Sequence, residues 1–318
     1  MTHAIRDLCQ TLQLNQQDLD QLNIENNSSF ACKVPKDYLE QIELSNPNDP
    51  LLKQVIPLQV ENELAEGFSL DPVSDLEFNP TPSLIHKYQG RVLLIASPKC
   101  DIHCRYCFRR HFPYEQQTNT RHWQTALEKI AEDQTIHEVI LSGGDPMSLS
   151  EKSLVQLIDK IEAIPHIKTL RIHSRTPVVA PSKSPIKAFI HWAKNSRLNK
   201  VLVVHCNHAN ELSDKTAQLF SLYRNAGFHL LNQSVLLAGV NDQVSILEDL
   251  SHKLFSQGVL PYYLNQLDRV QGSAHFEVDQ QKACELHLQL RARLSGYLLP
   301  KLVKDMAEKP YKTPLFYT

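Results

Sequence analysis

The chain has 318 residues, 42% of them hydrophobic, and a formal net charge of −2 from 33 basic and 35 acidic side chains. This composition suits a soluble protein with one large core, and no apolar run approaches the ~20 residues that span a bilayer. Charges of both signs are mixed along the chain, which gives no electrostatic case for nucleic acid as a primary partner.

The cysteines and the N-terminus indicate a cellular compartment. Seven cysteines, an odd number with three of them clustered, do not suggest a disulfide framework. Residues 1–7 lack the apolar core of a signal peptide. We therefore expect a protein of the reducing cytoplasm with no membrane partner.

Residues 1–85 are expected to form a mainly helical and irregular extension. Residues 37–42 could form one or two helical turns, and residues 46–50 (NPNDP) are a strong turn signal. Residues 71–82 contain three prolines and are expected to form an extended loop.

The pattern then changes to alternating strands and helices, over residues 86–276. Six β-branched or apolar runs predict strands at residues 91–97, 137–141, 168–173, 200–205, 228–237 and 259–264. Amphipathic runs predict helices at residues 123–133, 149–164, 185–195, 212–226 and 244–256. Ser150 can cap the second helix, and residues 277–318 are expected to hold a C-terminal helix and tail. Six βα units in series predict an α/β fold with a parallel sheet, either doubly wound or curled into a partial barrel.

Three cysteines follow the first predicted strand at spacing C-x3-C-x2-C, as Cys100, Cys104 and Cys107. Three thiolates on one loop can bind a [4Fe–4S] cluster and leave one iron open to a small molecule. Two alternatives remain on spacing alone: a zinc knuckle completed by His103 or His111, or thiols that merely cluster.

Polar residues follow each of the other predicted strands. Gly143-Gly144-Asp145 follows the second strand, where glycines admit a ligand to the backbone and Asp145 could accept from an ammonium group. By itself this stretch is also an ordinary turn. Arg175 follows the third strand, His205 ends the fourth, and Asp268 follows the sixth. Because βα barrels carry their chemistry at the carboxyl ends of the strands, this pattern favours an active site there.

These stretches together resemble the radical S-adenosylmethionine superfamily. The resemblance narrows to the lysine 2,3-aminomutase family and covers residues 47–314. Its further blocks are residues 174–179 (SRTPVV), 232–237 (NQSVLL), 239–242 (GVND), 261–263 (PYY) and 312–314 (KTP). It implies a partial (β/α)6 TIM-like barrel of the radical SAM type, with a [4Fe–4S] cluster, S-adenosylmethionine and pyridoxal 5′-phosphate as cofactors.

Two features depart from the clostridial-type enzymes of this family. The sequence extends six residues past Lys312 without their additional cysteine-containing segment, and Leu267 stands where they have cysteine. The short form, with residues 267–276 (LDRVQGSAHF), resembles the bacterial aminomutases that supply β-lysine for modifying elongation factor P. The resemblance thus implies a functional link to an elongation factor P lysyl-ligase.

The resemblance also implies roles for the cofactor-binding residues. Cys100, Cys104 and Cys107 would ligate the cluster, and Lys312 would form the Schiff base with pyridoxal phosphate, because imine exchange needs an ε-amine.

Other residues at the strand ends would contact the cofactors. Gly143, Gly144 and Asp145 would help to bind them. Arg175 would lie near the pyridoxal phosphate, with a structural ion pair as its alternative.

The resemblance also implies which residues bind the substrate. Arg109 matches the family's carboxylate-binding arginine, and Asp268 and Asp305 match the two acids that bind the distal ammonium group of free L-lysine. An unidentified low-potential electron donor would be needed. The alternatives are an aminomutase acting on another amino acid, such as glutamate, or a non-catalytic iron–sulfur or zinc module.

Overall fold

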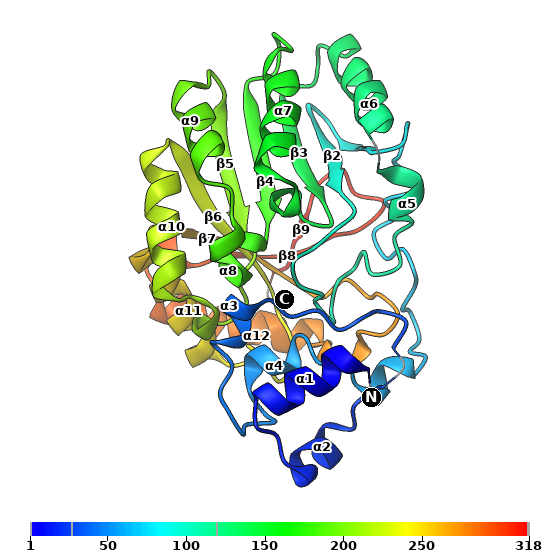
Figure 1. The fold of residues 1–318 in the computed structure, drawn as a ribbon, viewed down its shortest axis with the longest axis vertical. Helices are drawn as coiled ribbons and strands as arrows, with labels where there is room; N and C mark the ends of the chain where they lie inside the picture. The colour runs from blue at the N-terminus through cyan, green and yellow to red at the C-terminus, as the bar shows by residue number, and fades with distance from the viewer. Residues whose placement is uncertain (1, 27, 119, 317–318) are drawn as a thin grey trace.

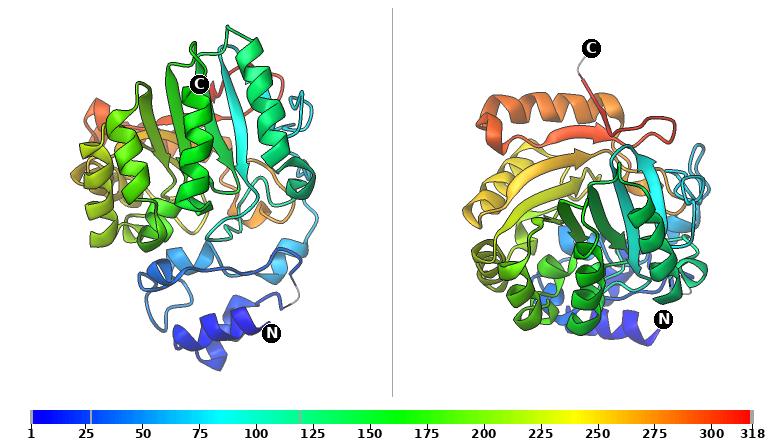
Figure 2. Two further views of the ribbon diagram at one scale, coloured as in Figure 1. Left: turned by 45° about the horizontal axis from the view of Figure 1, so that its top comes forward. Right: turned by 90° about the horizontal axis from the view of Figure 1, so that it is seen from above.

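The computed structural model describes residues 2–26, 28–118 and 120–316. Within them, nine strands form a single sheet whose spatial order follows the chain from β1 to β9 (Figure 1). The strands are β1 (Leu84–Tyr88), β2 (Arg91–Ser97), β3 (Glu138–Gly143), β4 (Thr169–Ser174), β5 (Asn199–Val204), β6 (Phe228–Val235), β7 (Leu260–Asn265), β8 (Lys301–Lys304) and β9 (Thr313–Pro314). The sheet curls, and helices cover its outer face (Figure 2).

Strands β2 to β8 run parallel, and β1 and β9 are antiparallel at the two edges. Because sequential parallel strands joined by helices wind in one sense, the result is an α/β partial barrel, as predicted. All six predicted strands are present as β2 to β7 within two residues at each boundary. The predicted number of parallel strands, six, was wrong, because β8 is a seventh parallel strand.

Helices alternate with the parallel strands. They are α5 (Tyr114–Gln117), α6 (Thr120–Glu132), α7 (Glu151–Glu162), α8 (Thr176–Val179), α9 (Lys187–Asn195), α10 (Asp214–Asn225), α11 (Val244–Ser256) and α12 (Gln280–Arg293). In α7 the apolar residues Leu154, Leu157, Ile158 and Ile161 recur at helical spacing and are buried. Ser150 caps this helix as predicted, because its side chain accepts a hydrogen bond from the Ser153 N–H at 3.1 Å.

In the described part of the N-terminal extension, the α-helices are α1 (His3–Thr11), α2 (Gln16–Leu22), α3 (Lys36–Leu39) and α4 (Pro50–Lys53). They lie together across one end of the barrel, in blue at the bottom of Figure 1. Leu8 of α1 and Leu51 of α4 belong to the same buried cluster as Leu94 of β2 and Leu141 of β3. The extension therefore shares the core of the barrel. The expected boundary at residue 85 falls inside strand β1.

The C-terminal segment contains the expected helix, α12, followed by a hairpin. Val303 pairs with Pro314 and Lys304 with Thr313, so β9 folds back antiparallel on β8. This hairpin returns Lys312 to the side of Asp305.

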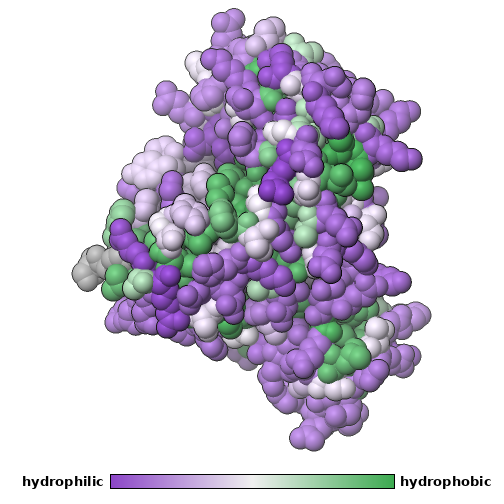
Figure 3. Space-filling model, turned by 90° about the vertical axis from the view of Figure 1, so that its left-hand side faces the viewer, coloured by the Kyte–Doolittle hydropathy of each residue, from purple (hydrophilic) through white to green (hydrophobic). Residues whose placement is uncertain are grey.

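Hydrophilic side chains predominate on the face shown in Figure 3. Over the described ranges, every helix is too short or too polar to cross a membrane.

Candidate active site

A cavity of about 480 Å³ lies inside the curled sheet. All eleven residues that the sequence singled out line it, although they come from six separate parts of the chain. They are Cys100, Cys104, Cys107, Arg109, Gly143, Gly144, Asp145, Arg175, Asp268, Asp305 and Lys312.

The N-terminal extension fixes the conformation of the cysteine loop. The Arg105 side chain is fully buried, and its Nε and Nη2 donate to the Glu61 carboxylate at 2.8 and 2.5 Å. The backbone N–H groups of His103 and Arg105 donate to the carbonyls of Lys33 and Gln54 at 3.0 and 2.9 Å. A buried, hydrogen-bonded ion pair and two main-chain bonds thus hold the loop with its cysteines against the cavity.

The two histidines of the zinc alternative contact backbone carbonyls, and neither belongs to the cavity lining that contains the three cysteines. His103 Nδ1 lies 2.8 Å from the Ala31 carbonyl, with its ring stacked on Phe30. His111 Nε2 lies 3.2 Å from the Gln271 carbonyl. In the part of the chain that the structure describes, no three His, Cys, Asp or Glu side chains converge on a single ion site.

The donor set of the loop fits an iron–sulfur cluster, because three thiols line one cavity and each can ligate a different iron. Burial, together with the neighbouring Cys104, raises the pKa of Cys107 to about 11. The thiolate is the metal ligand, so metal binding must displace the proton.

The end of β3 packs directly on the cysteine loop. Gly143 has φ +120°, and a Cβ on Gly144 would lie 2.5 Å from the Lys99 carbonyl oxygen. The N–H groups of Gly144 and Asp145 donate to the carbonyls of Ser97 and Lys99, both at 2.7 Å. The two glycines are therefore required by this close approach of two backbones.

Asp145 braces the following strand. Its buried carboxylate accepts from Ser174 Oγ and from the N–H groups of Met147, Arg175 and Thr176, at 2.6 to 2.9 Å. These contacts match the ordinary-turn alternative, since the protein itself satisfies the carboxylate. Its binding of a cofactor stays a prediction.

Substituting Gly144 with alanine is expected to destabilise the protein by about 1–3 kcal/mol, the usual cost of overpacking. The added methyl group would push against Lys99, which precedes Cys100, so reconstituted iron content should also fall. Gly296→Ala is the matched control, because a Cβ there meets nothing within 4 Å. Thermal denaturation and iron analysis check both; a Gly144 variant as stable and iron-rich as wild type would contradict this account.

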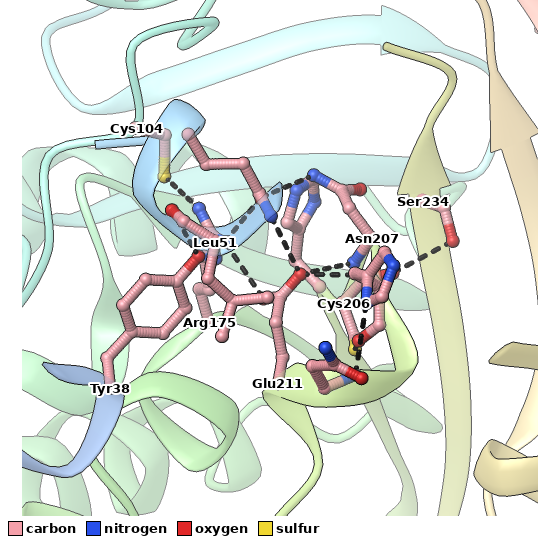
Figure 4. Close-up of polar contacts among 12 residues, drawn as sticks. Tyr38, Leu51, Cys104, Arg175, Cys206, Asn207, Glu211 and Ser234 are labelled. Atoms are coloured by element: carbon pink, nitrogen blue, oxygen red, sulfur yellow. Dashed lines mark hydrogen bonds and ion pairs between the residues drawn. The ribbon is translucent and has the colours of Figure 1, made fainter. Parts of the chain in front are cut away.

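Arg175 lies beside the cysteines in a buried polar network (Figure 4). Its Nη1 is 2.7 Å from Cys104 Sγ, and its Nη2 donates to Gln54 Oε1 and Glu211 Oε2 at 2.8 and 2.9 Å. The structure thus contains the ion pair that was the alternative for this residue. A role at the pyridoxal phosphate stays a prediction.

Lys312 and Asp305 form an ion pair at another part of the cavity wall. Lys312 Nζ lies 3.1 Å from Asp305 Oδ2, and Lys87 Nζ lies 3.0 Å from Asp305 Oδ1. The Tyr88 hydroxyl donates to the same carboxylate. Burial opposes ionisation, but Lys312 and Lys87 more than offset it and lower the pKa of Asp305. Asp305 is therefore an anion with two cations beside it, and it joins β1 to the end of β8.

Asp268 and Arg109 complete the predicted set. Arg109 Nε donates to Asp75 Oδ2 at 2.7 Å, and its Nη1 donates to Ser142 Oγ at 3.1 Å. Burial, reinforced by Asp305 and Asp75 against the opposing Lys312 and Lys87, raises the pKa of Asp268 to about 6. The charges of Lys312 and Asp305 therefore influence the ionisation of Asp268.

Asp268→Asn is expected to stabilise the cofactor-free protein at pH 8. The pKa of Asp268 is about 6 in the folded protein and 3.8 at its ordinary value. Between these two pH values the folded protein keeps a proton on the carboxyl that the unfolded chain has lost. Stability therefore falls as pH rises from about 4 to 6, by about 1–3 kcal/mol. Thermal denaturation should show the variant to be more stable at pH 8 and equal to wild type below pH 4. Lower stability of the variant at pH 8 would contradict this assignment.

Several cavity residues were not singled out from the sequence. Asp75 lies in the proline-containing loop, which gave no sign that it would anchor Arg109. Lys87 and Tyr88 belong to β1, a strand that was not predicted. Cationic Arg91 and Arg171 and the half-buried His173 also line the cavity. Their alternation with apolar residues along the strands was the available signal.

Comparison with known proteins agrees with this site. A profile of the Radical SAM superfamily matches residues 94–250, which include the cysteine loop and strands β3 to β6. Residues 94–250 therefore form a radical SAM domain.

Individual relatives define the family. L-lysine 2,3-aminomutase of Escherichia coli (strain K12) is 47% identical over 287 residues, which cover 90% of this chain and 83% of the relative. That of Haemophilus influenzae is 43% identical over 317 residues, with 98% and 93% covered. That of Clostridium subterminale is 37% identical over 290 residues, with 90% and 69% covered. The chain belongs to the lysine 2,3-aminomutase family.

Family membership makes the chain an isomerase of the aminomutase type. It implies a [4Fe–4S] cluster, S-adenosylmethionine and pyridoxal 5′-phosphate as cofactors.

Proposed function

We propose that this enzyme converts free L-α-lysine to β-lysine in a pyridoxal phosphate-dependent reaction. One observation carries the proposal: a single cavity is lined by three cysteines, a lysine paired with a carboxylate, a second carboxylate and an anchored arginine. The names of the relatives support lysine as the amino acid.

The cofactor residues are assigned by their chemistry. Cys100, Cys104 and Cys107 would hold the cluster. The cluster would bind S-adenosylmethionine and supply the electron that releases the initiating radical from it. Lys312 would hold pyridoxal phosphate, which supplies a conjugated imine for the migrating nitrogen. The cations Lys87, Arg91 and Arg171, in the same cavity, are suited to its phosphate.

The substrate would be held by both of its ends. Arg109 would bind the α-carboxylate, because Asp75 and Ser142 fix its guanidinium from one side. Asp268 and Asp305 would bind the distal ammonium group. Glutamate is disfavoured as the substrate, since it needs a cation at the place of these two acids.

Asp305 is paired with Lys312 and Lys87. Lys312 would hold pyridoxal phosphate, and Lys87 would keep a cation beside the carboxylate. Asp305, together with Asp268, would offer its negative charge to the distal ammonium group of lysine, since a charge in a largely buried site is stabilised by an opposite charge.

The test is an anaerobic reaction of the reconstituted enzyme with free L-lysine, S-adenosylmethionine, pyridoxal phosphate and dithionite. We expect β-lysine, resolved from α-lysine by chromatography at unchanged mass, and none when pyridoxal phosphate is omitted. No product with lysine but a product with another amino acid would overturn the substrate assignment. Absence of both product and 5′-deoxyadenosine would favour the non-catalytic alternative.

The biological setting is proposed from residues 267–276, which resemble the short bacterial enzymes. We propose that the enzyme acts in the cytoplasm, takes electrons from a low-potential donor and supplies β-lysine to a ligase that modifies elongation factor P. Coupling the purified enzyme to such a ligase tests this link, because modified elongation factor P should gain the mass of one lysyl group only when both enzymes are present.

A further inference from the structure

Arg175 donates toward the sulfur of a cluster ligand. Its Nη1 lies 2.7 Å from Cys104 Sγ, although the two residues are 71 positions apart. Both residues also line the cavity. The contact joins the end of β4 to the cysteine loop after β2, so it follows from the fold and not from local sequence.

The guanidinium is fixed by its surroundings. Its Nη2 is held by Gln54 and Glu211 at 2.8 and 2.9 Å. The rings of Tyr38 and Tyr106 each lie 5.6 Å from its central carbon. Two polar anchors and two aromatic faces leave Nη1 aimed at the sulfur (Figure 4).

Glu211 is fixed as firmly as Arg175. It is buried, and its Oε1 accepts from the N–H groups of Asn207 and His208 at 2.9 and 3.0 Å. It therefore neutralises most of the charge of the guanidinium. What Arg175 presents to Cys104 is one oriented N–H donor and only a small net charge.

We infer that Arg175 is a positioning residue that tunes the cluster through Cys104. A donor to a ligating sulfur stabilises the reduced cluster, because the added electron increases the negative charge on the sulfurs. The Arg175 hydrogen bond thus raises the reduction potential and makes the cluster easier to reduce. This inference rests on the cluster assignment and not on lysine as the substrate.

The decisive experiment measures the cluster potential by EPR-monitored redox titration, without lysine or pyridoxal phosphate. Removing Arg175 alone would leave Glu211 buried and unpaired, so the main variant is the neutral pair Arg175→Gln with Glu211→Gln. Its midpoint potential is expected to shift to a more negative value at unchanged iron and sulfide content. Failure of the aminomutase assay would leave this result unaffected.

A matched pair controls for the loss of any ion pair from the barrel. Arg293 of α12 pairs with Glu248 of α11 at 3.1 Å, and both residues lie outside the cavity lining. Arg293→Gln with Glu248→Gln should therefore leave the potential unchanged. An unchanged potential in the Arg175 pair, or an equal shift in the control pair, would overturn the inference.

Arg175→Lys is the second variant if the neutral pair does not fold. It keeps a cation beside Glu211 but replaces the planar fork with a single nitrogen that cannot serve all three partners. Its potential is expected to lie below that of wild type. A wild-type potential in this variant would also overturn the inference.

Discussion

Replacing Lys312 with alanine is expected to abolish the visible absorbance of bound pyridoxal phosphate and to lower turnover by about 10³-fold or more, because the variant lacks the ε-amine that is assigned to the imine. Iron content should not change, since Lys312 is paired with Asp305 and is not one of the residues assigned to the cluster. Asp305 keeps Lys87 as a partner at 3.0 Å, so folding should be preserved. Absorbance spectra of reconstituted protein and iron analysis give the two readouts.

Lys309→Ala is the matched control for this experiment. Lys309 lies three residues before Lys312 and is exposed, and the variant should keep the absorbance band. Borohydride reduction followed by peptide mass spectrometry should place the cofactor on Lys312 in wild type and in the Lys309 variant. A band that persists in the Lys312 variant would remove this residue from its role.

Asp268→Asn and Asp305→Asn are each expected to lower kcat/KM for lysine by about 100-fold or more. Losing one partner of a buried charge pair costs roughly 2–5 kcal/mol, and every 1.4 kcal/mol is tenfold. Binding of norleucine, which has the same chain but no distal ammonium group, should not weaken. Steady-state kinetics with lysine and competition by norleucine measure the two effects.

Two observations would contradict this assignment of the acids. One is unchanged lysine kinetics in both variants. The other is equal weakening of lysine and norleucine, which would indicate a general disturbance of the cavity. Asp242→Asn serves as the control, because Asp242 pairs with Lys282 on the surface at 2.8 Å and should have no effect on either ligand.

Strands β2 to β7 were predictable because each carries several apolar or β-branched residues in a row or in alternation. Strand β2 (RVLLIAS) is one such run, and its predicted and observed bounds agree. Strand β8 is only four residues long, KLVK, with lysines at both ends. Such a segment becomes a strand through its neighbour β7, and its own sequence carries too little pattern to show it.

The candidate site could be predicted residue by residue, but its pairings could not. Nothing local in the sequence links Asp75 to Arg109, Lys87 to Asp305 or Arg175 to Cys104, because each pair meets only when distant strands and loops come together. Arg175 illustrates the difference. The sequence identified it as a residue of the site, whereas its contact with Cys104 came from the fold.

Because of the ion pair between Arg105 and Glu61, we expect assembly of the iron–sulfur cluster to depend on the folding of a distant part of the chain. The cysteine loop takes its shape from residues 28–61, through Ser28, the Phe30 carbonyl, Glu61 and Arg105. We therefore expect the loop to present its three thiols together after the extension has docked, so that iron–sulfur assembly follows this folding step. A bound cluster would in turn stabilise the docked extension by mass action.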